Sequence, residues 1–149
     1  MSIIFSRVRD KANLDKSLEL RKKVFVVEQR VPEDRELDEY DNPERLDKDV
    51  FHFNVFKDDI CISTARIVKE KEVKIQRVCV DKNYRGLGIG LYIMKELHKF
   101  IEDSGIKQAT LSSQEHSIEF YKKLGYVEIG NPYLDAGILH KKMYLNFPF

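Results

Sequence analysis

The chain contains few of the residues that stabilise small secreted or metal-bound domains. Its 149 residues include two cysteines, Cys61 and Cys79, which are too few and too far apart for a disulfide framework or a CxxC zinc site. We expect both to be reduced, half-buried thiols. The longest aliphatic and aromatic run is Val24 to Val27, far short of the roughly 20 residues that span a bilayer. The sequence therefore predicts no transmembrane helix and no membrane partner.

A secretory signal and an excess of one charge are also lacking. The chain reaches Arg7 without an apolar signal segment, which predicts a cytoplasmic location. A net charge of +1 argues against a nucleic-acid partner, which would require a strongly basic face. The charge is unevenly spread, since Glu33 to Asp49 holds nine acidic and three basic residues. The simplest interpretation of this acidic segment is a solvated loop, and the alternative is a surface that attracts a cation.

Length and hydrophobic periodicity predict one domain over residues 1–149, with mixed α and β structure. Three strands on short turns are typical of an antiparallel meander, and an amphipathic helix with Asn13 as its cap precedes them. A β-α-β-α-β order follows, which implies a mixed sheet covered by helices. The predicted strands are Ile3–Val8, Val50–Phe56, Ile60–Val68, Val73–Val80, Ala109–Leu111, Tyr126–Ile129 and Ile138–Leu145; the helices are Asn13–Gln29, Leu91–Glu102 and Ser117–Leu124; and Gly130-Asn131-Pro132 is a predicted turn.

A glycine-rich turn between a strand and a helix carries the strongest chemical signal. Val78-Cys79-Val80 is followed by Arg85-Gly86-Leu87-Gly88-Ile89-Gly90 at the start of a predicted helix. Such a turn gathers unpaired N–H groups at the positive end of the helix dipole, where a pyrophosphate fits. Glycine keeps side chains away from the phosphate, and Arg85 adds charged hydrogen bonds. The alternative is that the glycines serve only a tight turn and helix packing.

Two other phosphate-binding motifs fail at this turn. A P-loop needs Lys and Ser or Thr after its last glycine, but Leu91 and Tyr92 follow Gly90. The dinucleotide fingerprint needs a third glycine where this chain has Leu91 or Ile93, and it belongs near the start of a parallel sheet. Neither a P-loop NTPase nor a Rossmann domain fits the sequence.

Two motifs together resemble a known superfamily. Arg85, Gly88 and Gly90 form Arg-x-x-Gly-x-Gly, and SIEFYKKLGY from Ser117 to Tyr126 is similar to a helix motif Phe-Tyr-x-x-x-Gly-Phe/Tyr. In this order the motifs resemble the GNAT superfamily of acyl-CoA N-acyltransferases from about Val50 onward. RKKVFVVEQRVPEDRELDEYD, residues 21–41, further resembles the ElaA/YjcF-like subgroup. The resemblance implies an α+β GNAT-like fold, a largely antiparallel mixed sheet of about six or seven strands with a V-shaped splay between its two central strands.

The resemblance also implies which residues bind the donor, acetyl-CoA. Pantetheine would pair with the strand at Val78 and Val80, beside Cys79, and a bulged amide near Val80 would stabilise the oxyanion. Tyr121 matches the general acid that protonates the departing thiolate, and Gln114 stands where the family often has an Asn that contacts pantetheine. The residues expected to bind the cofactor are Val78, Cys79, Val80, Arg85, Gly86, Leu87, Gly88, Ile89, Gly90, Gln114, Ser117 and Tyr121.

Several of these residues have ordinary structural alternatives. Helix periodicity alone makes Tyr121 a core aromatic residue beside Phe120. Glu28 is our candidate base or amine anchor, with its pKa raised by the apolar Val24–Val27 setting, or else it is an exposed helix-end carboxylate. Cys79 invites an acyl-cysteine mechanism, which we discount because no activating histidine is placed by the sequence.

The remaining acids and histidines carry weaker signals. Asp38, Glu39 and Asp41 could attract an amine, although solvation is the simpler interpretation of each. His116 could contact substrate, although a capping or surface role is the simpler one. The other histidines show no metal-ligand spacing, so we predict no metal site; they are His52, His98 and His140.

The sequence favours an N-acetyltransferase that moves an acetyl group from acetyl-CoA to a primary amine of a small molecule, such as an amino sugar or a polyamine, by direct attack through a tetrahedral intermediate. The acceptor pocket is expected between the first helix, the acidic segment and residues 133–139. The alternatives are a non-catalytic CoA-binding sensor or interaction module, and a nucleotide-binding regulator. Exposed sheet edges and the C-terminal Phe147-Pro148-Phe149 make a homodimer possible.

Overall fold

The computed structural model describes residues 2–149 and contains one seven-stranded sheet in the order β1-β2-β3-β4-β5-β7-β6. Only β4 and β5 pair in parallel, and every other neighbouring pair is antiparallel. This confirms the predicted mixed, largely antiparallel sheet. The strands are β1 (Ile3–Arg7), β2 (Val50–Lys57), β3 (Ile60–Lys69), β4 (Val73–Val80), β5 (Gln108–Gln114), β6 (Val127–Asp135) and β7 (Ile138–Asn146).

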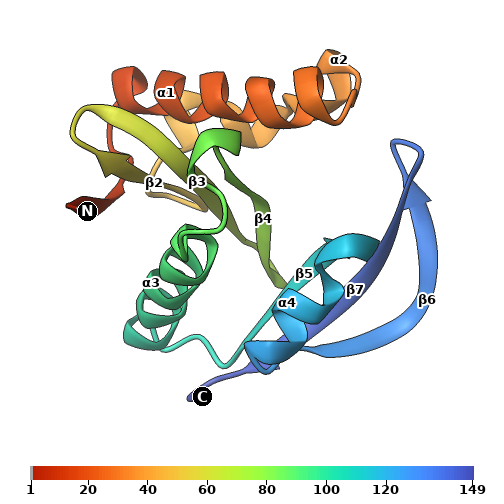
Figure 1. Ribbon diagram of the computed structural model, residues 1–149. Helices are drawn as coiled ribbons and strands as arrows, with labels where there is room; N and C mark the ends of the chain where they lie inside the picture. The colour runs from red at the N-terminus through yellow and green to blue at the C-terminus, as the bar shows by residue number, and fades with distance from the viewer. Residues whose placement is uncertain (1) are drawn as a thin grey trace.

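Helices cover both faces of this sheet (Figure 1). On one face lie α1 (Lys11–Arg21) and the π-helix η1 (Lys22–Glu28); α3 (Ile89–Asp103) lies on the other, and α4 (Ile118–Lys123) packs beside β5. The acidic segment forms α2 (Glu33–Glu36) and the 3-10 turns η2 (Glu39–Asp41) and η3 (Pro43–Arg45). Two further 3-10 turns, η4 (Lys82–Tyr84) and η5 (Glu115–Ser117), precede α3 and α4. The C-terminal ends of β4 and β5 are not covered by these helices and line a cleft.

The main core lies between α3 and the sheet. The α3 face formed by Ile93, Met94, Leu97 and Ile101 is completely buried, and each such side chain contributes about 1.5–3 kcal/mol when it leaves water. The three-to-four-residue spacing predicted this face. Phe147 is also buried and its ring lies 5.5 Å from that of His98. Phe147 is therefore not available to a dimer interface, whereas Phe149 is 75% exposed and the homodimer stays a prediction.

Several element boundaries differ from the predictions. Asp10, not Asn13, caps α1, because the Asp10 carboxylate accepts the Asn13 N–H at 2.8 Å. The first helix does not continue as an α-helix to Gln29 but changes into the π-helix η1. The predicted turn at Gly130-Asn131-Pro132 lies inside β6, where a register shift between Ile129 and Tyr133 absorbs the extra residues.

Candidate active site

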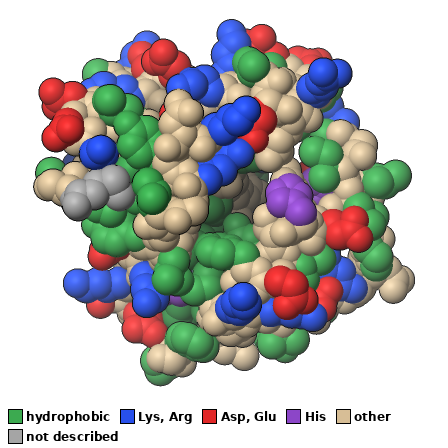
Figure 2. Space-filling model, in the orientation of Figure 1, with side chains coloured by type: hydrophobic (Ala, Val, Ile, Leu, Met, Phe, Trp, Pro, Cys, Tyr) green, Lys and Arg blue, Asp and Glu red, His purple; other side chains and the backbone are tan. Residues whose placement is uncertain are grey.

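The site lies where the two central strands separate. β4 and β5 are paired only at Lys74–Thr110 and Ile75–Leu111, and beyond these pairs they diverge (Figure 1). The divergence opens a cleft of about 1390 Å³. Figure 2 shows the molecule hollowed near the centre of the visible face, with charged side chains above the hollow and hydrophobic ones below it. A cleft between parallel strand ends exposes backbone groups that a neighbouring strand would otherwise pair.

Val78 and Val80 present their backbone groups to this cleft. The Asp81 N–H donates to Ile62 O at 2.8 Å in β3, and Ser63 Oγ donates to Cys79 O at 2.8 Å. Because backbone groups alternate along a strand, those of Val80 point away from β3. Val78 and Val80 both line the cleft. An extended chain could therefore hydrogen-bond to this strand edge, and the pairing of pantetheine with it stays a prediction of the family resemblance.

The bulge in β4 lies nearer the middle of the strand than expected. The register with β3 shifts between Thr64 and Arg66, and Arg77 on the facing stretch of β4 has a φ of 57°. An extra residue in one strand bends it and re-aims the following groups. We expected the bulged amide near Val80, and the structure places the irregular residue at Arg77. Val80 itself is the regular register partner of Ser63 in β3, in a pair whose backbone groups do not hydrogen-bond to each other.

The glycine-rich turn leads directly into the N-terminus of α3. Gly88 is the N-cap with a φ of 81°, and no side chain caps the helix. The first-turn N–H groups are therefore free to bind an anion at the positive end of the helix dipole. The helix begins at Ile89, two residues earlier than expected, so Gly90 lies inside the first turn. A β-carbon at Gly90 would lie 3.5 Å from Cζ of Phe120, which is an ordinary packing contact.

Arg85 and Glu28 form a paired bridge from the turn to η1. Arg85 Nη1 and Nη2 lie 2.5 Å and 2.8 Å from the Glu28 carboxylate oxygens, and Arg85 Nε donates to Val80 O at 3.1 Å. The hydrogen bond from Arg85 lowers the pKa of Glu28, although burial opposes this. Our expectation of a raised pKa was wrong, because η1 turns Glu28 toward Arg85 rather than into an apolar setting.

Tyr121 lies in the wall of the cleft. It projects from α4, is almost completely buried, and its ring packs 5.1 Å from that of Phe120 and 5.7 Å from that of Tyr126. Burial raises the pKa of Tyr121 above its ordinary value, so the phenol keeps its proton at neutral pH. Ser117 also lines the cleft. Tyr121 is thus a core aromatic residue that also borders the site.

Two glutamines join the halves of the site. Gln114 Nε2 donates to Gln29 Oε1 at 2.7 Å, and both residues line the cleft. Gln114 was predicted, but Gln29 was missed because it is the last residue of the predicted helix and belongs to no motif. Arg35 Nη2 and Asp135 Oδ1 form a similar bridge at 3.1 Å. These contacts hold η1 and α2 beside β5 and β6 across the cleft.

The cysteines and histidines are poorly placed for chemistry. Cys79 is buried against Leu20 and Val24, and burial raises the pKa of its thiol, which opposes thiolate formation. His116 is exposed at the edge of the cleft. His52 is buried with its ring Nε2 3.1 Å from Tyr40 O. Within residues 2–149 no three His, Cys, Asp or Glu side chains gather as metal ligands would.

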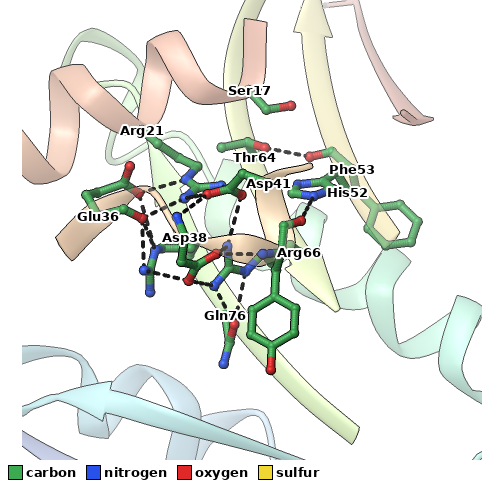
Figure 3. Close-up of polar contacts among 12 residues, drawn as sticks. Ser17, Arg21, Glu36, Asp38, Asp41, His52, Phe53, Thr64, Arg66 and Gln76 are labelled. Atoms are coloured by element: carbon green, nitrogen blue, oxygen red, sulfur yellow. Dashed lines mark hydrogen bonds and ion pairs between the residues drawn. The ribbon is translucent and has the colours of Figure 1, made fainter. Parts of the chain in front are cut away.

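The acidic segment is solvated only in part: Glu33, Asp34 and Glu44 are exposed, whereas Glu36 and Asp41 are buried. Arg21 donates to both carboxylate oxygens of Asp41, at 2.6 and 3.0 Å, and to Glu36 Oε1 at 2.7 Å. Arg66 binds Asp38 at 2.6 Å and Asp41 at 2.9 Å. Figure 3 shows these side chains meeting between α1 and the sheet. Asp38 and Asp41 are therefore neutralised by buried arginines, while Glu39 is exposed 3.8 Å from Arg45.

Similarity to known proteins agrees with this geometry. A sequence profile described as "Acetyltransferase (GNAT) domain" matches residues 21–147. YjcF of Bacillus subtilis (strain 168), described as an uncharacterized N-acetyltransferase, is 34% identical over 91% of this chain and 94% of its own. The crystal structure of Escherichia coli ElaA is 30% identical, covers 96% of this chain and 99% of its own, and superposes with a TM-score of 0.83. That of an acyl-CoA N-acyltransferase from Pseudomonas aeruginosa is 28% identical, with 96% and 99% coverage and a TM-score of 0.84.

The family match and the fold identify the chain as an acyltransferase. The chain belongs to the GNAT acetyltransferase family, and its sheet and helices form the GNAT fold. The open strand edge at Val80 and the uncapped start of α3 fit an acyl-CoA. Within the described residues, no helix is long and apolar enough to span a membrane.

Proposed function

We propose that this acyltransferase moves an acetyl group from acetyl-CoA to a primary amine of a small molecule by direct attack. One observation carries the proposal: a single cleft is lined by the β4 edge at Val80, whose N–H points away from β3, by the uncapped turn at Gly88 and by the protonated phenol of Tyr121. The turn suits a diphosphate, the strand edge suits the amide groups of pantetheine, and the phenol supplies a proton.

Each residue has a distinct part in this proposal. The first-turn N–H groups of α3 and the Gly86–Gly88 turn would hold the diphosphate, with Arg85 shared between it and Glu28. The Val80 N–H would donate to the thioester carbonyl oxygen, where negative charge develops. The Tyr121 hydroxyl would protonate the departing thiolate, whose reference pKa is about 8.5. Burial raises the pKa of Tyr121, so the phenol is protonated at rest but is a weaker acid than a phenol in water, and the transfer requires the thiolate charge to develop directly beside its hydroxyl.

Glu28 would act as an anchor for the amine rather than as its base. Its pKa is lowered by Arg85, so it accepts a proton poorly at neutral pH. An alkyl amine of pKa about 10.4 is then expected to lose its proton to water in the open cleft. Glu28→Gln should weaken amine binding, seen as a higher KM, and should not weaken acetyl-CoA binding, because the variant releases Arg85 for the diphosphate.

The test of the proposal is a thiol-release assay with acetyl-CoA against a panel of amines. Tyr121→Phe keeps the packing against Phe120 and Tyr126 but removes the hydroxyl, and we expect at least a hundredfold loss of kcat, within the range that general acids contribute. Acetyl-CoA affinity, measured by calorimetry, should remain nearly constant. Unchanged turnover would remove Tyr121 from the mechanism.

The competing functions give different results in the same experiments. A non-catalytic CoA-binding sensor predicts acetyl-CoA binding without turnover of any amine. A nucleotide-binding regulator predicts that ATP or NAD raises the unfolding temperature while CoA does not. The acetyltransferase requires both acetyl-CoA binding and release of free thiol.

A further inference from the structure

The carboxylates that line the cleft are all neutralised by basic side chains. Glu28 is paired with Arg85, and Glu72 is paired with Lys142 at 2.8 Å. Glu36 is shared by Arg21 at 2.7 Å and Arg77 at 3.2 Å, and Asp135 is paired with Arg35. A cationic group that entered the cleft would therefore have to compete with an existing ion pair at each of these acids.

One basic side chain of the cleft is left over. Lys74 lines the cleft and, among the residues that the structure describes, no carboxylate lies within ion-pair distance of its Nζ. Its neighbour Glu72 is occupied by Lys142 and by the Thr110 hydroxyl at 2.6 Å. Lys74 is therefore the one lysine or arginine lining the cleft, among the described residues, that forms no ion pair, although its charge also acts on the Glu72 carboxylate that Lys142 already holds.

The sheet register places polar groups beside Lys74. Lys74 is paired with Thr110 across β4 and β5, and Ser112 is paired with Lys142 across β5 and β7. Paired residues share a face of the sheet, and so do residues two apart on one strand. The opposite face carries Ile75 and Leu111 in the core. Lys74, Thr110, Ser112 and Lys142 therefore form one polar surface at the closed end of the splay.

This surface is too far from the glycine-rich turn to bind the diphosphate. Lys74 precedes Val80 by six residues of β4, which is about 20 Å of extended strand. The four-carbon stem of lysine shortens this gap but does not close it. A charge at this end of the cleft can meet only the part of the acceptor that lies remote from the reacting amine.

We propose that the acceptor of this enzyme carries a carboxylate several bonds away from its amine, and that Lys74 binds this carboxylate. The inference rests on the proposed acetyl transfer and narrows its substrate class. It favours an elongated amino acid or peptide-like amine over a polyamine, whose second cation would meet Lys74. Thr110 and Ser112 lie on the same face, but the Thr110 hydroxyl already donates to Glu72 and the Ser112 hydroxyl is hydrogen-bonded to that of Tyr133, so the proposed contact is the one from Lys74.

The experiment compares amines that differ only at the remote end. β-Alanine, γ-aminobutyrate and ε-aminocaproate are each assayed by thiol release beside their primary amides and the alkylamines of equal length. We expect the carboxylates to have a kcat/KM about tenfold higher than their amides, which corresponds to about 1.4 kcal/mol. The preference should grow with length, because only the longer chain reaches Lys74. Equal or better use of the amides would overturn the inference.

Substitutions then assign the preference to Lys74. Lys74→Met should abolish the difference between carboxylates and amides, mainly through a higher KM for the carboxylates, and Lys74→Arg should retain it. Lys71→Met is the matched control, because Lys71 is exposed beside β4 and does not line the cleft. A preference that survives in Lys74→Met, with Lys74→Arg folded and active, would overturn the inference.

The two proposals fail in different ways. Thiol release from amines of every kind, without a carboxylate preference, would overturn the role of Lys74 and leave acetyl transfer intact. Acetyl-CoA binding without turnover of any amine would overturn the acetyl transfer and, with it, the inferred acceptor.

Discussion

Replacing Arg21 with methionine tests whether the buried ion cluster holds the acidic segment in place. Arg21 is 1% exposed and donates to Glu36 and Asp41. Removing one partner of a buried ion pair costs about 3–5 kcal/mol, because the other charge is left without compensation. Asp41 would keep Arg66 at 2.9 Å and Glu36 would keep Arg77 at 3.2 Å. We therefore expect Arg21→Met to lower the free energy of unfolding by about 3 kcal/mol.

The assay is urea unfolding followed by circular dichroism at pH 7. With a slope of about 1–3 kcal/mol per molar urea, the expected loss lowers the midpoint by about 1–3 M. Lys22→Met is the matched control, because Lys22 is the next residue, is exposed, and forms only a surface pair with Glu33 at 3.4 Å. A surface pair contributes about 0–1 kcal/mol. If Arg21→Met and Lys22→Met had the same midpoint, the cluster would not stabilise the fold as we infer.

The same cluster predicts a loss of stability in acid. Burial raises the pKa of Asp41, but the hydrogen bond and charge of Arg21, with the charge of Arg66, lower it overall from 3.8 to about 2. Because the unfolded chain takes up this proton first, the stabilisation is present above about pH 4 and is lost as the pH falls toward 2. In Arg21→Met this pH dependence should be smaller, as measured by urea midpoints between these values. An unchanged dependence would mean that Arg21 does not set the pKa of Asp41.

Three further predictions concern single groups. Gly88→Ala should lower stability by about 1–2 kcal/mol, since a φ of 81° is costly for an L-residue; an unchanged urea midpoint would contradict this. Cys79→Ala should retain thiol release from acetyl-CoA, because the buried thiol does not form a thiolate; complete loss of turnover in the folded variant would favour an acyl-cysteine. Burial lowers the pKa of His52 and of His98 to about 4 from 6.5, so the unfolded chain binds protons first and stability should fall from pH 6.5 to 4. A His52→Gln, His98→Gln double variant should show a weaker fall, and an equal fall would exclude these two groups as its source.

The parts of the fold that follow from local periodicity could be predicted. The buried face of α3 at Ile93, Leu97 and Ile101 follows from residues three and four apart, and the meander follows from short polar turns between branched strands. The glycine-rich turn was also located correctly, because the φ of 81° at Gly88 is one that glycine adopts without strain. In each case the physical cause acts within a few residues of the chain.

The parts that depend on distant residues could not be predicted. Arg66 lies 28 residues from Asp38 in the chain, yet the two side chains meet at 2.6 Å. A count of charges along the sequence identifies residues 33–49 as acidic. It cannot show that buried arginines on α1 and β3 form ion pairs with these acids. The direction of the Glu28 side chain could not be predicted either. The wider turn of the π-helix shifts the face on which later side chains project. The sequence had a hint in Arg66, which lies between Ala65 and Ile67, whereas Arg21 is followed by two lysines and carried no such hint.

The buried arginines change the charge that we expect at the remote end of the acceptor, while its reacting group remains an amine. The acidic composition of residues 33–49 suggested a surface that attracts cations. Three of its acids are instead paired with arginines: Glu36, Asp38 and Asp41 form ion pairs with Arg21, Arg66 and Arg77. These ion pairs hold α2 over the cleft, where Arg35 reaches Asp135. The ion pairs that position α2 beside the proposed acceptor site are thus the same ion pairs that neutralise the acidic segment. Lys74 is then the charge that an incoming molecule meets, and a carboxylate is the group that it can bind without first breaking an ion pair of the protein.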